Sequence, residues 1–123
     1  MNKKSRNRPL ILIADDEEGI RESFKLILED QYDLEFAANG AEALQKLKVL
    51  SPDILFLDIK MPKKHGMDTL KEAKKMKPAL PVVMVTGYQS LDTAQEAIRN
   101  GASDYIVKPF ETKKILEVVS TLV

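Results

Sequence analysis

The sequence contains no cysteine. A disulfide framework and a zinc site built on thiolates are therefore excluded, and we expect a cytoplasmic protein because a reducing compartment does not favour disulfides. Net charge is also absent, since 19 Lys and Arg residues balance 19 Asp and Glu residues. No overall field therefore recruits nucleic acid or anionic lipid. No apolar run approaches the ~20 residues of a membrane span, so we expect no membrane association.

The N-terminal stretch "MNKKSRNRPLILIA" joins a basic segment to an apolar one, as signal peptides do. Its apolar run ends after about five residues, whereas a secretory signal needs roughly seven to fifteen. We therefore expect a disordered tail over residues 1–8 and a single domain over residues 9–123. A length of 123 residues, with 44% hydrophobic and 31% charged residues, is typical of one globular domain.

Short apolar runs rich in branched residues alternate with stretches of helical periodicity. The expected strands are residues 10–14, 34–38, 53–57, 81–85 and 104–107. The apolar stripes of the expected helices are Ile20, Phe24, Ile27 and Leu28; Ala43, Leu44 and Leu47; Leu70, Ala73 and Met76; Leu91, Ala94, Ala97 and Ile98; and Ile115, Leu116, Val119 and Leu122. Five strands alternating with five helices predict an α/β fold, in which a doubly wound five-stranded parallel sheet carries helices on both faces.

The runs differ in how completely apolar they are. Residues 10–14, 53–57 and 81–85 are almost wholly apolar, which predicts strands buried on both faces, whereas the second and fifth strands are mixed and fit the sheet edges. The pair Asn39 and Gly40 is followed at once by a helical pattern and is interpreted as a strand-to-helix turn. Gly101 is interpreted as the residue that ends the fourth helix with a positive φ.

Polar side chains follow four of the five expected strands. Asp15 and Asp16 follow the first strand, Asp58 the third, Thr86 the fourth and Lys108 the fifth. In an open parallel sheet, ligands bind beyond the carboxyl ends of the strands. Three carboxylates within ~5 Å would repel by roughly 3 kcal/mol per pair at an effective dielectric near 20, so they require a cation. Oxygen ligands of this kind suit Mg²⁺, which favours phosphate partners.

A carboxylate at such a site can also attack phosphorus and form an aspartyl-phosphate. A metal ion then neutralises charge on the phosphoryl oxygens, while an ammonium and a hydroxyl hold the same group. Lys108 and Thr86 supply those two functions.

Four segments, in order, resemble the receiver domain of bacterial two-component response regulators. They are "DDEEGIR" after the first strand, "LDIKMPKKHGM" around Asp58, "VTGY" after the fourth strand and "GASDYIVKPF" around Lys108. The resemblance covers residues of roughly 10 to 122 and is closest in wording to the nitrogen-regulation class. It implies a flavodoxin-like (βα)5 three-layer sandwich with strand order 2-1-3-4-5, and a phosphoprotein that acts in phosphorelay signal transduction.

The resemblance also implies a role for each residue of the site. Asp58 would accept the phosphoryl group, and Asp16, Asp58 and the backbone carbonyl of Lys60 would bind Mg²⁺, with Asp15 acting through a metal-bound water. Lys108 would contact Asp58 and the phosphoryl group. Thr86 would move toward the new phosphoryl oxygen, and Tyr105 would turn inward as the aromatic switch. A cis peptide bond is implied between Lys108 and Pro109.

Partners follow from the same resemblance. The phosphoryl donor would be a phosphohistidine on a sensor histidine kinase or a phosphotransfer protein, docking on the first helix around Gly19 and Ile20. Output would run through the fourth helix, fifth strand and fifth helix, a face through which such domains often form homodimers. The nitrogen-regulation class normally continues into an ATPase and a DNA-binding domain, and the apolar ending "STLV" favours a segment of a longer regulator.

Two other functions fit part of the pattern. A Mg²⁺-dependent phosphohydrolase with an aspartyl intermediate would use the same acids, but the second residue after Asp58 is Lys60 and not a carboxylate able to act as a general acid. A phosphorylation-independent binding module would keep the fold alone. We expect a phosphorylation-controlled switch that is not an enzyme, apart from its own phosphorylation and slow autodephosphorylation.

Simpler interpretations remain for other residues. His65, the only histidine, is expected to be exposed in a polar loop, and Gly66 to permit a tight turn before the third helix. Seven lysines lie in residues 60–77; they are expected to form the wet face of an amphipathic helix and not a nucleic-acid site. Met67, Met76 and Met84 are expected to fill the core, and Tyr105 has strand packing as its alternative role.

Overall fold

The structure, a computed structural model, describes residues 8–60, 65–87 and 91–123, and within these ranges strands and helices alternate. The strands are β1 (Leu10–Ala14), β2 (Asp33–Ala37), β3 (Ile54–Leu57), β4 (Val82–Thr86) and β5 (Asp104–Val107). The helices are α1 (Glu18–Leu28), α2 (Gly40–Val49), α3 (Gly66–Met76), α4 (Leu91–Arg99) and α5 (Thr112–Leu122). All ten expected elements are present, with ends shifted by one residue for three strands.

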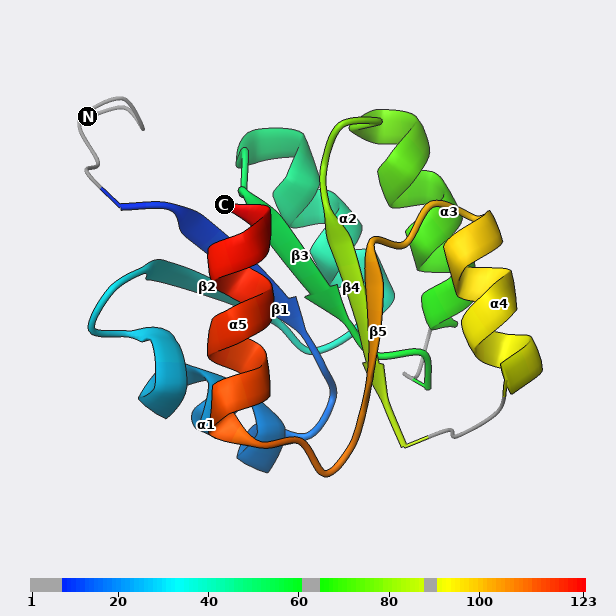
Figure 1. The fold of residues 1–123 in the computed structure, drawn as a ribbon. Helices are drawn as coiled ribbons and strands as arrows, with labels where there is room; N and C mark the ends of the chain where they lie inside the picture. Colours follow the sequence, from blue (N-terminus) through cyan, green and yellow to red (C-terminus); the bar gives the residue numbers. More distant parts are fainter. Residues whose placement is uncertain (1–7, 61–64, 88–90) are drawn as a thin grey trace.

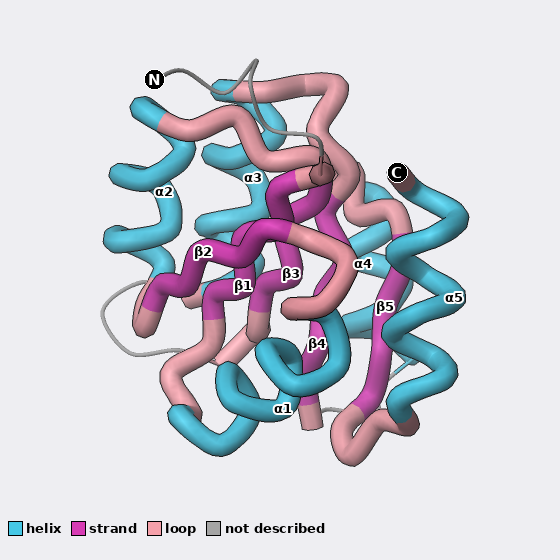
Figure 2. The backbone as a smooth tube through the Cα atoms, turned by 90° about the vertical axis from the view of Figure 1, so that its left-hand side faces the viewer, coloured by secondary structure: helices cyan, strands magenta, loops and turns pink. Residues whose placement is uncertain are grey.

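The strands form one parallel sheet in the order β2-β1-β3-β4-β5. Helices α1 and α5 cover one face, and α2, α3 and α4 cover the other (Figure 1). Figure 2, turned by 90°, shows α2 and α3 on one side of the strands and α5 on the other. The predicted doubly wound (βα)5 sandwich and its strand order are confirmed.

Alternate residues of the central strands feed two separate cores. In β1, Leu12 and Ala14 pack under α2 and α3, whereas Ile11 and Ile13 pack under α1 and α5. All residues of β1, β3 and β4 are buried, while β2 and β5 keep partly exposed positions at the sheet edges, as their mixed sequences predict. Burial of this apolar surface on both faces is the main stabilising contribution to the fold.

Local signals at two helix ends behave as the sequence predicts. Asn39 is the N-cap of α2, and its side chain accepts a hydrogen bond of 2.8 Å from the backbone N–H of Glu42. Gly101 follows α4 with φ of 103°, a conformation that a residue with a Cβ rarely adopts. The chain therefore turns from helix to strand at the residues expected.

Two apolar stripes are less buried than the sequence predicts. On α4, Ala97 is buried, but Leu91 is 72% exposed and Ile98 50% exposed, because this helix lies beside the β5 edge and meets the rest of the domain along a narrow strip. Met76 is also exposed, so its expected role in the core is wrong; it is the last residue of α3, where no further helical turn covers it. Met67 and Met84 are buried as expected.

The predicted disordered tail is mostly residues 1–7, which lie outside the described residues. Arg8, the first described residue, donates side-chain hydrogen bonds to the carbonyls of Glu29 and Tyr32. Among the described helices, none combines the length and the apolar character that crossing a bilayer demands.

Candidate functional site

The ends of two neighbouring strands place the acidic residues. β1 and β3 pair side by side with Ala14 opposite Leu57, so the residues that follow them, Asp15 and Asp58, leave the same edge of the sheet. The backbone N–H of Asp58 donates to the carbonyl of Ala14 at 3.0 Å, and that of Asp15 donates to Ala37 at 3.0 Å. The apolar strands therefore hold both aspartates by their main chains.

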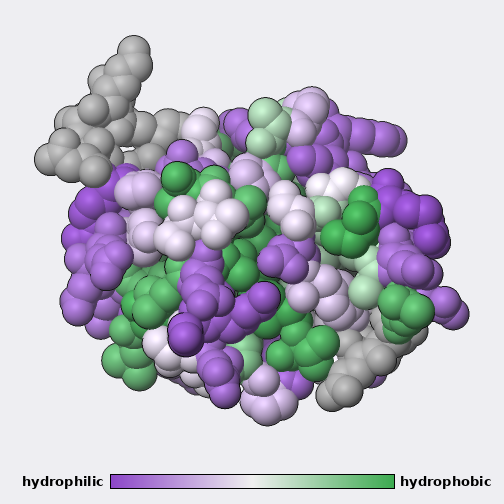
Figure 3. Space-filling view, viewed as in Figure 1, coloured by the Kyte–Doolittle hydropathy of each residue, from purple (hydrophilic) through white to green (hydrophobic). Residues whose placement is uncertain are grey.

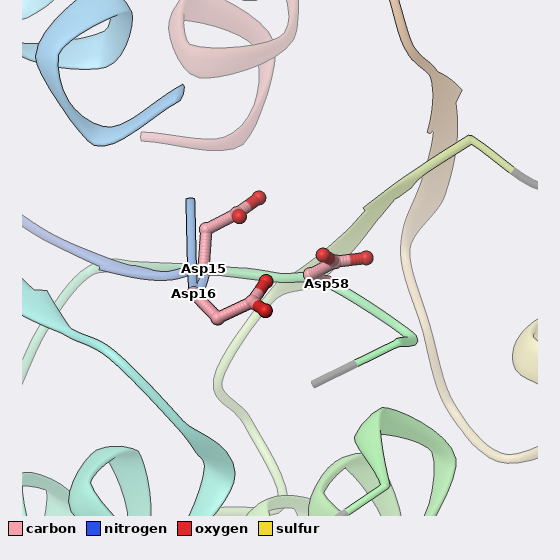
Figure 4. Close-up of side chains that lie close together, drawn as sticks. All are labelled: Asp15, Asp16 and Asp58. Atoms are coloured by element: carbon pink, nitrogen blue, oxygen red, sulfur yellow. The ribbon is translucent and has the colours of Figure 1, made fainter. Parts of the chain in front are cut away.

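Three carboxylates meet at this edge. Asp15, Asp16 and Asp58 each offer one oxygen, and these oxygens all lie within 4.8 Å of one another. Figure 4 shows Asp15 and Asp16 leaving the chain next to each other, with Asp58 facing them from the end of β3. Asp15 and Asp58 are buried, whereas Asp16 is exposed. The sequence prediction that these acids converge is confirmed at the level of geometry.

Lys108 brings a positive charge from the end of β5. Its Nζ lies 2.8 Å from Asp15 Oδ2 and 3.2 Å from Asp58 Oδ2. Its backbone N–H donates to the carbonyl of Thr86 at 2.8 Å, which fixes the end of β5 against β4. The peptide bond between Lys108 and Pro109 is cis, as the resemblance implies.

The electrostatics of the site are dominated by burial. Burial raises the pKa of Asp15, and hydrogen bonds from Lys108 and from the backbone of Glu17 offset only part of that rise. Burial, and then the negative charge of Asp15, raise the pKa of Asp58. Burial alone would lower the pKa of Lys108, but hydrogen bonds to Asp15 and Glu17 and the nearby charges raise it well above its ordinary value. Lys108 is therefore a permanent cation at neutral pH.

The loop after Asp58 is held close to that residue. The backbone N–H of Lys60 donates to Asp58 Oδ1 at 3.2 Å, so both carboxylate oxygens of Asp58 have a donor. The backbone N–H of Gly66 donates to the carbonyl of Ile59 at 2.8 Å. A Cβ on Gly66 would lie 2.1 Å from the carbonyl oxygen of Asp58. Gly66 is thus required by close packing against this loop, and not by a tight turn as the sequence suggested, because its φ is not in the positive region.

His65 is exposed, as expected. It also caps the N-terminus of α3, a role that the sequence interpretation missed. Its Nδ1 accepts a hydrogen bond of 3.2 Å from the backbone N–H of Met67, so His65 is the N-cap of α3. Histidine is not among the preferred N-cap residues, which explains why the pattern gave no signal.

The two residues expected to act as a switch lie on neighbouring strands, Thr86 on the interior strand β4 and Tyr105 on the edge strand β5. Thr86 ends β4 and is 1% exposed, while Tyr105 lies in β5 and packs partly buried against the core under α2, α3 and α4. Met84 is the residue opposite Tyr105 in the sheet, which places Thr86 two residues farther toward the site. Burial raises the pKa of Tyr105, so its hydroxyl stays protonated at neutral pH.

Sequence reasoning missed two residues that touch the site. Glu17 Oε1 lies 2.9 Å from Lys108 Nζ, and Arg21 Nη1 donates to the carbonyl of Asp15 at 2.7 Å. Both lie in the quoted segment "DDEEGIR", but the sequence analysis assigned a role to neither. Their contacts with the site are tertiary, so one-dimensional spacing does not reveal them.

The donor set fits a hard divalent cation. Asp15, Asp16 and Asp58 are the carboxylates that could hold an ion, and among the described residues only the ammonium of Lys108 forms an ion pair with two of them, Asp15 and Asp58. One positive charge does not balance them, and carboxylate oxygens within 4.8 Å of one another are close enough for small side-chain movements to bring them onto one ion. The arrangement can therefore bind Mg²⁺ beside a carboxylate and an ammonium, which is a combination suited to phosphoryl chemistry.

Comparison with known sequences gives a consistent result. A family model for the response regulator receiver domain matches residues 11–120. The chain is 36% identical over 110 residues to the regulatory protein AtoC of Escherichia coli (strain K12), covering 89% of this chain and 24% of that protein. It is 37% identical over 112 residues to the chemotaxis protein CheY of Thermotoga maritima, covering 89% of this chain and 93% of that protein. The chain thus spans about a quarter of AtoC and nearly all of CheY.

Solved structures agree with the sequences. The receiver domain of NtrX from Brucella abortus superposes with a TM-score of 0.86 at 37% identity, covering 91% of this chain and 96% of that chain. A CheY-like response regulator receiver domain protein from Methanospirillum hungatei JF-1 gives a TM-score of 0.89 at 36% identity, covering 94% of this chain and 93% of that chain.

Proposed function

This chain belongs to the response regulator receiver domain family of two-component systems, and from that premise we propose that Asp58 accepts a phosphoryl group from a phosphohistidine in a Mg²⁺-dependent reaction. The observation that carries the proposal is the meeting of Asp15, Asp16 and Asp58 with the ammonium of Lys108. The acids come from the ends of β1 and β3 and the lysine from the end of β5, so strands far apart in the sequence must join one sheet to assemble the site.

The transfer forms one bond and breaks one. A carboxylate oxygen of Asp58 attacks phosphorus, the bond from phosphorus to the donor's imidazole nitrogen breaks, and the imidazole leaves with the electron pair. Hydrogen bonds from Lys108 to Asp58 Oδ2 and from the Lys60 N–H to Asp58 Oδ1 orient the carboxylate for this attack. Because Lys108 stays protonated, it also stabilises negative charge on the phosphoryl oxygens as the bond forms.

Asp16, Asp58 and the backbone carbonyl of Lys60 would hold the metal ion, and Asp15 would hold one of its waters. When bound, Mg²⁺ would supply the positive charge that neutralises the phosphoryl oxygens. The carboxylate oxygens within 4.8 Å of one another support this assignment.

Phosphorylation is proposed to change the surface near β5. Thr86 would move toward the new phosphoryl oxygen, and Tyr105 would turn inward into the space that opens. The buried position of Thr86 and the partly buried position of Tyr105 on adjacent strands support a coupled movement.

Two surfaces are proposed for partners. A sensor kinase or phosphotransfer protein would dock on α1 around Gly19 and Ile20. This helix begins at Glu18, shortly after Asp15 and Asp16. Output, including a homodimer, would use α4, β5 and α5. Exposed Leu91 and Ile98 support the second surface, and hydrophobic atoms interrupt the polar surface on the α4 side of the view in Figure 3. The proposed function involves no turnover of an external substrate, and we propose a cytoplasmic location.

Acetyl phosphate tests the proposal directly. With Mg²⁺, the wild-type domain should gain the mass of one phosphoryl group, and Asp58→Asn should gain none. Removal of Mg²⁺ by a chelator should abolish the gain in the wild type. An undiminished gain in Asp58→Asn would defeat the assignment of Asp58, and turnover of added phosphoesters without a covalent intermediate would favour another function.

A further inference from the structure

Glu17 occupies the N-cap position of α1, but its side chain makes no capping hydrogen bond. Its backbone is nevertheless fixed on both sides. Its N–H donates to Asp15 Oδ1 at 2.9 Å, and its carbonyl accepts from the N–H groups of Ile20 and Arg21 at 3.1 Å. The start of the helix therefore holds the main chain of Glu17 in place and leaves its carboxylate available for a contact outside the helix.

That contact is Lys108. Glu17 Oε1 lies 2.9 Å from Lys108 Nζ, which also lies 2.8 Å from Asp15 Oδ2 and 3.2 Å from Asp58 Oδ2. An ammonium group has three N–H donors. Three carboxylates thus take up all the hydrogen-bonding capacity of Lys108 in this state of the domain.

The three carboxylates differ strongly in exposure. The side chains of Asp15 and Asp58 are 2% and 5% exposed, whereas that of Glu17 is 60% exposed. A buried carboxylate that loses its cation is costly, whereas an exposed one regains hydrogen bonds from water. A phosphoryl group on Asp58 would need a donor from Lys108. Glu17 is the partner that Lys108 can release at the lowest cost.

We infer that Glu17 is a positioning residue that holds Lys108 in its resting place and competes with the phosphoryl group for it. The inference rests on the proposed function of Asp58. It assigns to Glu17 a control over how readily the phosphorylated state forms, because Lys108 is released from Glu17 as it binds the new phosphoryl oxygens. Removing the carboxylate of Glu17 therefore favours that state.

Beryllofluoride, which stands in for the phosphoryl group on Asp58, provides the measurement. At saturating Mg²⁺, an NMR titration of Glu17→Gln should show beryllofluoride binding about two- to fivefold tighter than wild type, the range expected for an exposed ion pair. Glu18→Gln is the matched control, because it removes the same charge from the next residue. Glu18 lies in the first turn of α1 and is not an ion-pair partner of Lys108 in the described structure.

A double-mutant cycle separates a role through Lys108 from a general effect of charge. In a Lys108→Met background, Glu17→Gln should no longer change beryllofluoride affinity, because the ammonium for which Glu17 and beryllofluoride compete is absent. An undiminished effect in that background would overturn the inference. Mg²⁺ affinity without beryllofluoride should match wild type in Glu17→Gln, and a clear loss would mean that Glu17 holds the ion instead.

The outcomes also distinguish this inference from the proposed function. A wild-type domain that does not respond to beryllofluoride and Mg²⁺ would overturn both. A wild-type response with Glu17→Gln equal to wild type, or equal to Glu18→Gln, would overturn only the competition for Lys108.

Discussion

Asp58 combines two unfavourable conditions for an ionised carboxylate. It is 4% exposed, and a second buried carboxylate, Asp15, lies beside it. Burial and the charge of Asp15 raise the pKa of Asp58, and Lys108 compensates only in part. In the absence of a metal ion, the charge of Asp58 therefore destabilises the folded domain at neutral pH.

Asp58→Asn should consequently stabilise the metal-free domain. Repulsion between two charges ~5 Å apart is about 3 kcal/mol at an effective dielectric near 20, and Lys108 cancels part of it, so we expect a gain of about 1–2 kcal/mol. Lys108 keeps Asp15 and Glu17 as partners in the variant. Thermal unfolding in the presence of a chelator measures the gain. Asp30→Asn, at an exposed position after α1, is the control and should change little.

The gain should depend on pH in a defined direction. The folded-state pKa values of Asp15 and Asp58 both lie above the ordinary value of 3.8. Below that value the carboxyls are protonated in both the folded and the unfolded state and contribute no penalty. The penalty grows as pH rises from the ordinary value to the folded-state values and is complete above them. The difference in melting temperature between Asp58→Asn and wild type should therefore be largest near pH 7 and shrink on acidification. A difference that grows toward acidic pH would contradict this account.

The docking of α3 against the end of β3 depends on one residue without a side chain. A Cβ at position 66 would lie 2.1 Å from the carbonyl oxygen of Asp58 and 2.5 Å from Ile59 Cα, and neither backbone atom can move without disturbing the site. We expect Gly66→Ala to destabilise the domain by about 1–3 kcal/mol, as overpacking does, and to weaken Mg²⁺ binding by displacing Asp58.

Gly19→Ala is the matched control for that substitution. Gly19 lies inside α1, and a Cβ there would meet nothing within 4 Å. Alanine should stabilise this helix by up to about 1 kcal/mol. Denaturant unfolding of both variants measures the contrast, and a Gly66→Ala variant as stable as Gly19→Ala would show that the loop after β3 rearranges freely.

At the level of helices and strands, the sequence was most informative where burial is complete. The all-apolar strands β1, β3 and β4 and the mixed edges β2 and β5 could be predicted because a central parallel strand meets helices on both faces. The apolar stripe on α4 led to a wrong expectation of burial, because the rest of the domain covers this helix only in part. Leu91 and Ile98 have helical spacing, but spacing alone does not report that this helix lies at the edge of the sheet.

Some residues of the site could be predicted from the sequence, and others could not. The convergence of Asp15, Asp16, Asp58 and Lys108 could be predicted because strand ends of a parallel sheet share one edge. The contact of Glu17 with Lys108 joins residues that are 91 positions apart, and its exposed carboxylate has no periodic signature. Gly66 could not be interpreted correctly either, since its constraint is a tertiary distance to Asp58 and not its own backbone angle.

For the domain taken together, the fold itself creates the cluster of carboxylates that we propose as the metal site. In the unfolded chain, Asp58 is far along the sequence from Asp15 and Asp16, and only the pairing of β1 with β3 brings their oxygens within 4.8 Å. An ion that binds the folded state alone stabilises it by mass action, by about 2.7 kcal/mol when its free concentration is a hundred times Kd. The same carboxylates that oppose folding without the ion should therefore favour folding with it.

This coupling predicts that the melting temperatures of wild type and Asp58→Asn, plotted against Mg²⁺ concentration, cross. Without Mg²⁺, Asp58→Asn should melt above wild type. As Mg²⁺ is added, the melting temperature of wild type should rise by several degrees, while that of Asp58→Asn, which has lost a proposed metal ligand, should rise much less. Asp30→Asn should follow wild type throughout, since it changes charge without touching the site. Melting temperatures over a Mg²⁺ titration give all three curves. Parallel curves for wild type and Asp58→Asn would mean that the ion binds elsewhere, and the crowding of Asp15 and Asp58 would then need to be relieved by Lys108 alone.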